Sequence, residues 1–147
     1  MNKKLVKEQF FSMLHDGMRI MVGGFLTCGT PELLIDWLVE SKVKDLTIIC
    51  NDAGYPDKGV GKLLNHHQVK KLIVTHIGTN PNAGHMMSSH EIEVELIPQG
   101  TFVEQIRAAA GNLGGVLSPT GLHTPVEDGK RIIEIKGKSY ILSEPIE

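Results

Sequence analysis

The sequence has 147 residues, of which 41% are hydrophobic and 22% are charged, and its formal net charge is −2. This balance and length are typical of one globular domain, so we expect a single domain over residues 1–147. No run of lysine or arginine exceeds two residues, which argues against nucleic acid as a partner, and no apolar run is long enough to span a membrane. The basic N-terminus lacks the apolar segment of a signal peptide, so we expect a cytoplasmic protein.

Strands and helices alternate along the first two thirds of the chain. Apolar residues at helical spacing predict a first helix that ends at Asp16-Gly17. A second helix is predicted to have Thr30 as its N-cap and Pro31 as its first helical residue. Short apolar runs predict strands at residues 18–22, 46–50, 72–76 and 92–97, with a short helix around residues 63–64 and a longer one lined by Phe102, Val103, Ile106 and Ala110.

This alternation predicts an α/β fold with an open, mainly parallel sheet and helices on both faces. The C-terminal part has a different pattern. Residues 131–136 and 139–142 are strand-like and flank Gly137-Lys138, which predicts an antiparallel β-hairpin.

A glycine-rich loop follows the first predicted strand and includes Gly23, Gly24, Phe25 and Gly29. Glycine lets the backbone approach a ligand closely, and the helix after the loop offers free N–H groups. The loop is neither a phosphate-binding P-loop nor a dinucleotide fingerprint. From these residues alone, a ligand-binding loop and an ordinary strand–helix turn remain equally open.

Two side-chain amides follow predicted strands. Asn51 comes directly after the second strand, and Gln99 comes after the fourth strand and Pro98. Ligands of open α/β sheets bind at the carboxyl ends of the strands. The amide of Gln99 could donate to a developing oxyanion, or it could only bond the neighbouring backbone. Asp52 and Gly54 are interpreted as turn residues.

The two cysteines, Cys28 and Cys50, are too few for a disulfide framework. None of the seven histidines has a recognisable metal-ligand spacing with them, so we expect no bound metal. Cys28 lies in the glycine-rich loop, but no histidine is placed by sequence to activate it as a nucleophile.

Four segments in this order resemble the α subunit of family I CoA-transferases, the acetate, acetoacetate or butyrate type related to succinyl-CoA:3-oxoacid CoA-transferase. The segments are Gly23-Gly24-Phe25 with Gly29 and Pro31, Asn51-Asp52-Ala53-Gly54, Glu95-Leu96-Ile97-Pro98-Gln99-Gly100-Thr101 with Glu104, Ile106 and Arg107, and Ser118-Pro119-Thr120-Gly121 with Thr124. The third is long and specific, and the four together cover nearly the whole chain. Ala108-Ala109-Ala110 departs from the family pattern, in which a glycine pair follows Arg-Ala.

The resemblance implies a CoA-transferase-like α-type domain that continues past Glu147 with another strand–helix portion, so that this chain is short at its C-terminus. It also implies a hetero-oligomer with a β subunit that carries the catalytic glutamate. The substrates would be an acyl-CoA and a short-chain carboxylate or 3-oxoacid. Coenzyme A would be a substrate, and no cofactor is expected. The reaction would pass through an acyl-glutamyl anhydride and a glutamyl-CoA thioester.

The resemblance further implies roles for individual residues. Gln99 and Asn51 would bind carboxylate or oxyanion oxygens as catalytic residues. The expected substrate-binding residues are Gly23, Gly24, Phe25, Gly29, Gly100 and Thr101.

Two other functions remain open from the sequence. One is a shortened, non-catalytic homologue that binds a small carboxylate, an acyl-CoA or a protein partner. The other is a sugar-phosphate isomerase or effector-binding domain, which would need a basic cluster near the strand ends. Only Lys58 and Lys62 lie near such a position, so this possibility is the weakest.

Overall fold

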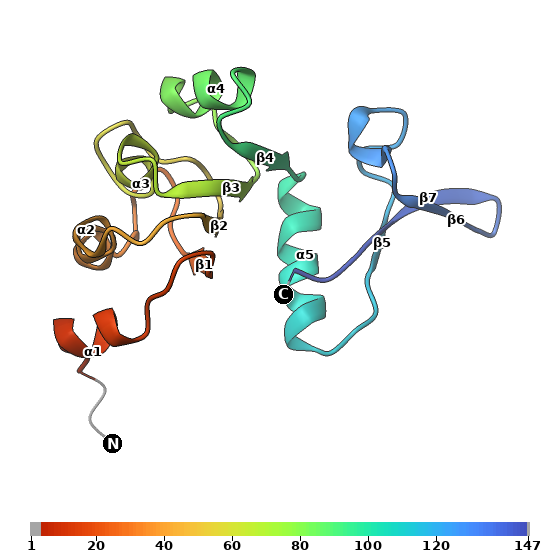
Figure 1. Ribbon diagram of the computed structural model, residues 1–147. Helices are drawn as coiled ribbons and strands as arrows, with labels where there is room; N and C mark the ends of the chain where they lie inside the picture. The colour runs from red at the N-terminus through yellow and green to blue at the C-terminus, as the bar shows by residue number, and fades with distance from the viewer. Residues whose placement is uncertain (1–3, 147) are drawn as a thin grey trace. The chain divides into compact units, whose positions relative to one another are not determined.

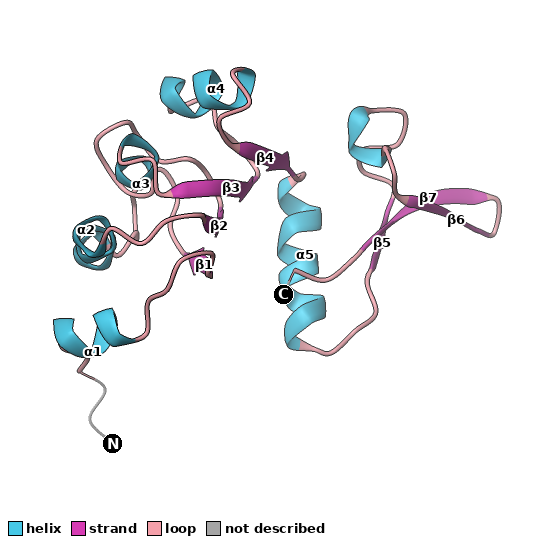
Figure 2. Ribbon diagram, viewed as in Figure 1, coloured by secondary structure: helices cyan, strands magenta, loops and turns pink. Residues whose placement is uncertain are grey.

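The computed structural model describes residues 4–146, and the chain divides into two compact units, one up to Glu95 and one from Leu96 onward. The first unit alternates helices and strands, as Figures 1 and 2 show. Its elements are α1 (Lys7–Ser12), β1 (Arg19–Val22), α2 (Glu32–Ser41), β2 (Leu46–Cys50), α3 (Gly61–Asn65), β3 (Val69–Val74), α4 (Pro81–Ser88) and β4 (Glu93–Leu96), the last of which ends at the boundary between the units.

The strands of the first unit form a four-stranded sheet in the order β1-β2-β3-β4, and β1, β2 and β3 are parallel. Their register places side chains in two rows, Ile20–Ile48–Leu72 on one face and Met21–Ile49–Ile73 on the other. The first row belongs to the main core, to which α2, α3 and α4 also contribute buried residues. The α/β class with a parallel sheet is therefore confirmed.

The second row of side chains explains why apolar and polar residues do not alternate regularly in β2. Ile49 and Ile73 are only 3% and 5% exposed, although they lie on the face opposite the main core. A strand that is buried on both faces reads as a continuous apolar run. The run from Leu46 to Cys50 therefore predicted both the strand and its double burial.

The acids of β4 have a partner on the neighbouring strand. Lys71 of β3 places its Nζ 2.7 Å from Glu93 Oε1 and 3.1 Å from Glu95 Oε2. Ile92, just before Glu93, and Val94, between the two acids, pack with the main core. The alternation of acids and apolar residues thus reflects one face of β4 on the core and one on a lysine.

The second unit contains one long helix and a small antiparallel sheet. Its elements are α5 (Gln99–Ala110), β5 (Val116–Ser118), a 3-10 turn η1 (Pro125–Glu127), β6 (Arg131–Ile135) and β7 (Lys138–Ser143), and the strand order is β5-β7-β6. The predicted C-terminal hairpin is confirmed as β6 and β7. Its turn is Lys136-Gly137, not Gly137-Lys138, because Ile135 pairs with Lys138. Both turn residues have positive φ, +51° and +72°, as a type I′ hairpin turn requires.

Two local predictions were wrong or incomplete. Helix α2 begins at Glu32 with Pro31 as its N-cap, so Thr30 is not the cap. Helix α4 was not predicted, although Asn80 caps it by accepting a hydrogen bond from the Asn82 N–H at 3.2 Å. Its sequence, Pro-Asn-Ala-Gly-His-Met-Met-Ser, contains few apolar residues at helical spacing. Among residues 4–146, no helix is long and apolar enough to cross a membrane.

Substitution of two leucines of α2, one buried and one exposed, tests the position of the core. Leu38 is 3% exposed and Leu33 is 60% exposed. We expect Leu38→Ala to lower the free energy of unfolding by about 2–5 kcal/mol, because it leaves a cavity in the core. Leu33→Ala, the matched control, should change it by less than about 0.5 kcal/mol. Denaturant titration of the two variants measures both values, and equal losses would contradict this core.

Candidate active site

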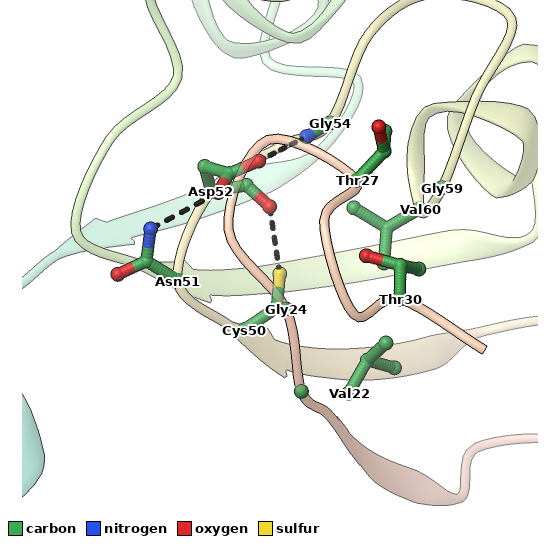
Figure 3. A pocket seen from close by; sticks show the side chains of 11 residues that line it. Val22, Gly24, Thr27, Thr30, Cys50, Asn51, Asp52, Gly54, Gly59 and Val60 are labelled. Atoms are coloured by element: carbon green, nitrogen blue, oxygen red, sulfur yellow. Dashed lines mark hydrogen bonds between the residues drawn. The ribbon is translucent and has the colours of Figure 1, made fainter.

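The candidate site of the first unit is built by two loops at the carboxyl ends of adjacent strands. One loop leaves β1 and contains the glycine-rich segment, and the other leaves β2 at Asn51. Figure 3 shows the small pocket where they meet, which is lined by Val22, Gly23, Gly24, Thr27, Thr30, Cys50, Asn51, Asp52, Gly54, Gly59 and Val60. Its volume is about 10 Å³, the room of roughly one water molecule. The loops therefore pack against each other and leave no room for an acid between them.

The first loop contains a tight turn. Phe25 and Cys28 exchange two backbone hydrogen bonds, with N···O distances of 3.0 and 2.8 Å. The two residues between them, Leu26 and Thr27, have φ of +51° and +93°. Turns with positive φ at both central positions normally use asparagine, aspartate or glycine. The Leu-Thr pair is therefore strained and has to be held by its surroundings.

The carboxylate of Asp52 stabilises this turn through a hydrogen bond from the Leu26 N–H. It is only 6% exposed and accepts three N–H groups. The Leu26 backbone and the Asn51 side chain donate to Oδ2 at 2.9 and 3.0 Å, and the Gly54 backbone donates to Oδ1 at 2.9 Å. Asp52 therefore ties the turn of the first loop to the start of the second loop.

Glu32 also connects the two loops, but here the carboxylate follows the first loop and the N–H group belongs to the second loop. It lies in the first turn of α2, just after the first loop, and its Oε1 accepts the Gly59 N–H of the second loop at 2.9 Å. Its Oε2 accepts from Lys62 Nζ at 2.8 Å. The contact is close, since a methyl group added at Gly59 would lie 3.4 Å from the methyl carbon of Thr27. The two loops are thus cross-linked in both directions by carboxylates.

The end of β2 is also fixed from the neighbouring strand and helix. The Asn51 carbonyl accepts from the Thr75 N–H and hydroxyl at 3.0 and 2.8 Å. Asn80, which is fully buried, donates its side-chain amide to the Ala53 carbonyl at 3.0 Å. The Thr79 hydroxyl donates to the Gly54 carbonyl, also at 3.0 Å. Asn51 is therefore presented on a backbone with little freedom to move.

The predicted glycines and Phe25 all lie in the glycine-rich loop, but they differ in exposure and in the room around them. Gly24 has φ of +130°, and a methyl group added to it would collide with the Thr30 hydroxyl. A methyl group at Gly23 would meet nothing within 4 Å. The Phe25 side chain is 62% exposed, and Gly29 is also exposed. Gly24 is therefore required by the close contact with Thr30, and Gly29 by its φ of +78°, whereas Gly23 has no such requirement.

The other predicted residues lie in the second unit, in the first turn of α5. Gln99 is the first helical residue and is exposed, as is Gly100. Within the described part of the chain, no hydrogen bond engages the Gln99 side chain, so its amide is available. Thr101 is instead 6% exposed, and its hydroxyl lacks a partner among residues 4–146.

The cysteines have different environments. Cys28 is exposed, whereas Cys50 is buried and donates its thiol to the Asp52 carbonyl at 3.1 Å. Burial, with a smaller contribution from the Asp52 charge, raises the pKa of the Cys50 thiol far above its ordinary value. Cys50 is therefore protonated at neutral pH and is not a nucleophile. Residues 4–146 contain no group of three or more potential metal ligands.

Asp52, Glu32 and Asn80 are residues whose roles the sequence did not reveal. Asn80 had a usable signal, since asparagine before proline is typical of a helix start. Asp52 and Glu32 had none, because their loop partners, Leu26 and Gly59, are 26 and 27 residues away.

Comparison with known proteins identifies the family. The sequence model described as Coenzyme A transferase matches residues 6–147. The chain belongs to the coenzyme A transferase family. It is 54% identical over 147 residues to the acetoacetyl-CoA:acetate/butyrate CoA transferase alpha subunit of Clostridium acetobutylicum, covering 99% of this chain and 67% of that relative. It is 46% identical over 144 residues to the acetate CoA-transferase subunit alpha of Escherichia coli K12, covering 98% of this chain and 66% of that relative.

A solved structure supports the fold independently. An acyl-CoA transferase from E. coli O157:H7, in a thioester complex with CoA, aligns with a TM-score of 0.79. The alignment covers 97% of this chain and 32% of that chain at 22% sequence identity, so it shows a common fold. The present chain thus spans about two thirds of the length of the α subunits it resembles and about one third of the chain in this solved structure.

The two neighbouring glycines give a matched test of the loop. We expect Gly24→Ala to lower the free energy of unfolding by about 1–3 kcal/mol, because alanine is strained at φ +130° and collides with Thr30. Gly23→Ala should have an effect of less than about 0.5 kcal/mol, since the added methyl meets nothing. Thermal unfolding compares the two variants, and a Gly23 variant as unstable as the Gly24 variant would contradict this loop geometry.

Proposed function

We propose that this chain is part of the α subunit of a CoA-transferase that moves coenzyme A between a short-chain acyl-CoA and a short-chain carboxylate or 3-oxoacid. The observation that carries the proposal is the Asn51 amide, fixed at the end of β2 beside the glycine loop, in a chain of the coenzyme A transferase family. The C. acetobutylicum relative is named for acetoacetyl-CoA, acetate and butyrate. This name supports acids of similar size as substrates.

Asp52 and Glu32, the two carboxylates that connect the loops, do not supply a nucleophile. Both oxygens of Asp52 accept N–H groups of the protein, and both oxygens of Glu32 are likewise engaged. A carboxylate that attacks a thioester needs a free, exposed oxygen. We therefore assign the nucleophile to a glutamate of a partner β subunit, as the resemblance to two-subunit enzymes suggests.

The proposed transfer balances in four steps. The glutamate attacks the thioester carbonyl, the C–S bond breaks, and CoA leaves as a thiolate while an acyl-glutamyl anhydride forms. The thiolate attacks the glutamyl carbonyl, which releases the first carboxylate and gives a glutamyl-CoA thioester. The second carboxylate attacks this thioester and gives a new anhydride and the CoA thiolate. The thiolate then attacks the new acyl carbonyl, which forms the second acyl-CoA and restores the glutamate.

Each attack places negative charge on a carbonyl oxygen. Asn51 uses one amide hydrogen for Asp52 and keeps the other available, and the exposed amide of Gln99 has both. Fixed neutral donors of this kind stabilise an oxyanion without protonating it. We assign this role, together with the binding of the substrate carboxylate, to Asn51 and Gln99.

The small size of the pocket between the loops supports a site that other parts of the enzyme complete. A volume of about 10 Å³ does not hold a carboxylic acid. The glycine loop then forms one wall of the acyl site, with Gly23, Gly24, Gly29 and the exposed Phe25 ring on it. Gly100 and Thr101 would support Gln99 in the same function. The proposal requires coenzyme A as a substrate and no metal or redox cofactor.

The two amides provide the test. In the complex isolated through this chain from its source, we expect Asn51→Ala and Gln99→Ala each to lower kcat for CoA transfer about 100-fold, because each removes a donor to the oxyanion. The thermal stability of the complex should change little in the Gln99 variant, since Gln99 is exposed. Steady-state assays with acetoacetyl-CoA and acetate measure the loss.

Gln9→Ala is the matched control. Gln9 is an exposed amide of α1 whose side chain accepts only from the Val6 N–H. Its replacement should leave the transfer rate unchanged. Full activity of both Asn51→Ala and Gln99→Ala would exclude their assigned roles. A wild-type complex without any CoA transfer would favour a non-catalytic binding protein instead.

A further inference from the structure

We propose that Asp52 is a positioning residue, which sets the orientation of the Asn51 amide and holds the Phe25–Cys28 turn against it. The inference rests on the proposed function, because Asn51 is catalytic only if the protein transfers CoA. Asp52 itself need not contact the substrate. Its buried carboxylate acts through the two groups that it binds.

The hydrogen bond to Asp52 decides which way the Asn51 amide faces. A carboxylate has only acceptor atoms, so the NH₂ group of Asn51 has to point toward it. Figure 3 shows the amide nitrogen turned to Asp52 and the amide oxygen turned away. Without the carboxylate, nothing among the described contacts of this side chain would fix its amide plane. The position of the second amide hydrogen, which is the proposed oxyanion donor, depends on Asp52.

A single oxygen atom couples the amide to the glycine loop. Oδ2 of Asp52 accepts from Asn51 Nδ2 at 3.0 Å and from the Leu26 backbone at 2.9 Å. Oδ1 accepts separately from Gly54. A shift of the Phe25–Cys28 turn would therefore move Asp52 Oδ2, and with it the Asn51 amide. The glycine loop and the Asn51 amide thus keep a fixed position relative to each other.

The second loop contains a comparable turn that no carboxylate among residues 4–146 binds. Tyr55 and Lys58 form the corresponding bridge, with Pro56 and Asp57 between them. Neither Pro56 nor Asp57 has a positive φ, and proline favours this kind of turn by itself. The Asn65 side chain donates to the Pro56 carbonyl, but no side-chain carboxylate binds residues 55–58 among the described hydrogen bonds. The external carboxylate occurs where the central residues are strained, at Leu26 and Thr27.

The backbone of Asp52 is anchored well enough for its side chain to act as a fixed point. Asp52 forms a parallel bridge with His76, and the next residue, Ala53, donates to the His76 carbonyl at 3.2 Å. The Asp52 carbonyl accepts the buried thiol of Cys50 at 3.1 Å. Because the Asp52 backbone is fixed, its carboxylate can hold the Leu26 N–H and the Asn51 amide in fixed positions.

The test combines kinetics with hydrogen exchange on the complete enzyme complex. We expect Asp52→Ala to lower kcat at least about tenfold, because misplacement of a catalytic group by about 1 Å costs up to 100-fold in rate. Asp52→Asn should retain part of the activity, since its one side-chain oxygen can still accept from Leu26 and Asn51. Asp57→Asn is the matched control, because Asp57 is exposed in the second loop.

Two readouts separate positioning from general stability. In an Asn51→Ala background, the loss caused by Asp52→Ala should shrink to about threefold or less, because residues in contact are coupled. Hydrogen exchange measured by mass spectrometry should accelerate over residues 23–30, which contain the Leu26 amide, and stay unchanged over β3 and α3.

The outcomes are distinct for the two proposals. Equal losses from Asp52→Ala in both backgrounds would overturn the positioning role while leaving the transferase function intact. Faster exchange across the whole first unit would also overturn it, since Asp52 would then be only a stability residue. Absence of CoA transfer in the wild-type complex would overturn the proposed function and, with it, any catalytic role for Asp52.

Discussion

The backbone at the end of β2 is hydrogen-bonded by residues just after β3 and just before α4, and the candidate site depends on these bonds. Asn51, Ala53 and Gly54 each give a carbonyl to a neighbouring side chain, and their positions are therefore fixed. Only a fixed strand end can hold the buried carboxylate of Asp52 against a strained turn. The glycine loop takes its conformation from that carboxylate and from Glu32. The Asn51 amide, which we propose as an oxyanion donor, is thus held by Asp52 on a backbone that is bonded to the neighbouring strand end.

Hydrophobic periodicity predicted most of the sheet because burial in this chain follows the strand pattern closely. Residues 46–50 were predicted as a strand and form β2, and the acids of β4 alternate with core residues because Lys71 lies on one face. Helix α4 was not predicted because its buried face is short, consisting of Ala83 and Met86, and because its N-terminus is fixed by the buried cap Asn80. The hairpin was predicted correctly, but its turn was misplaced by one residue because glycine can occupy either central position.

The site could be predicted less completely than the fold. Asn51 and Gln99 were recognisable as amides after strands, and the structure gives Asn51 a fixed place beside Gly24. Asp52 was interpreted as a turn residue because aspartate before glycine is common in turns. Its bond to Gly54 fits that interpretation, but its bond to Leu26 crosses between loops, and no local pattern encodes such a contact. Glu32 was unpredictable for the same reason.

We propose that this chain contributes oxyanion donors and a loop wall, and that the nucleophile lies on a partner chain. The most direct measurement is denaturing intact-mass spectrometry of the isolated complex after incubation with acetoacetyl-CoA. We expect a mass increase equal to a CoA thioester on the partner chain and none on the chain that contains Asn51. A CoA adduct on this chain, or active transfer with no adduct on either chain, would show that the nucleophile is not a glutamate of the partner.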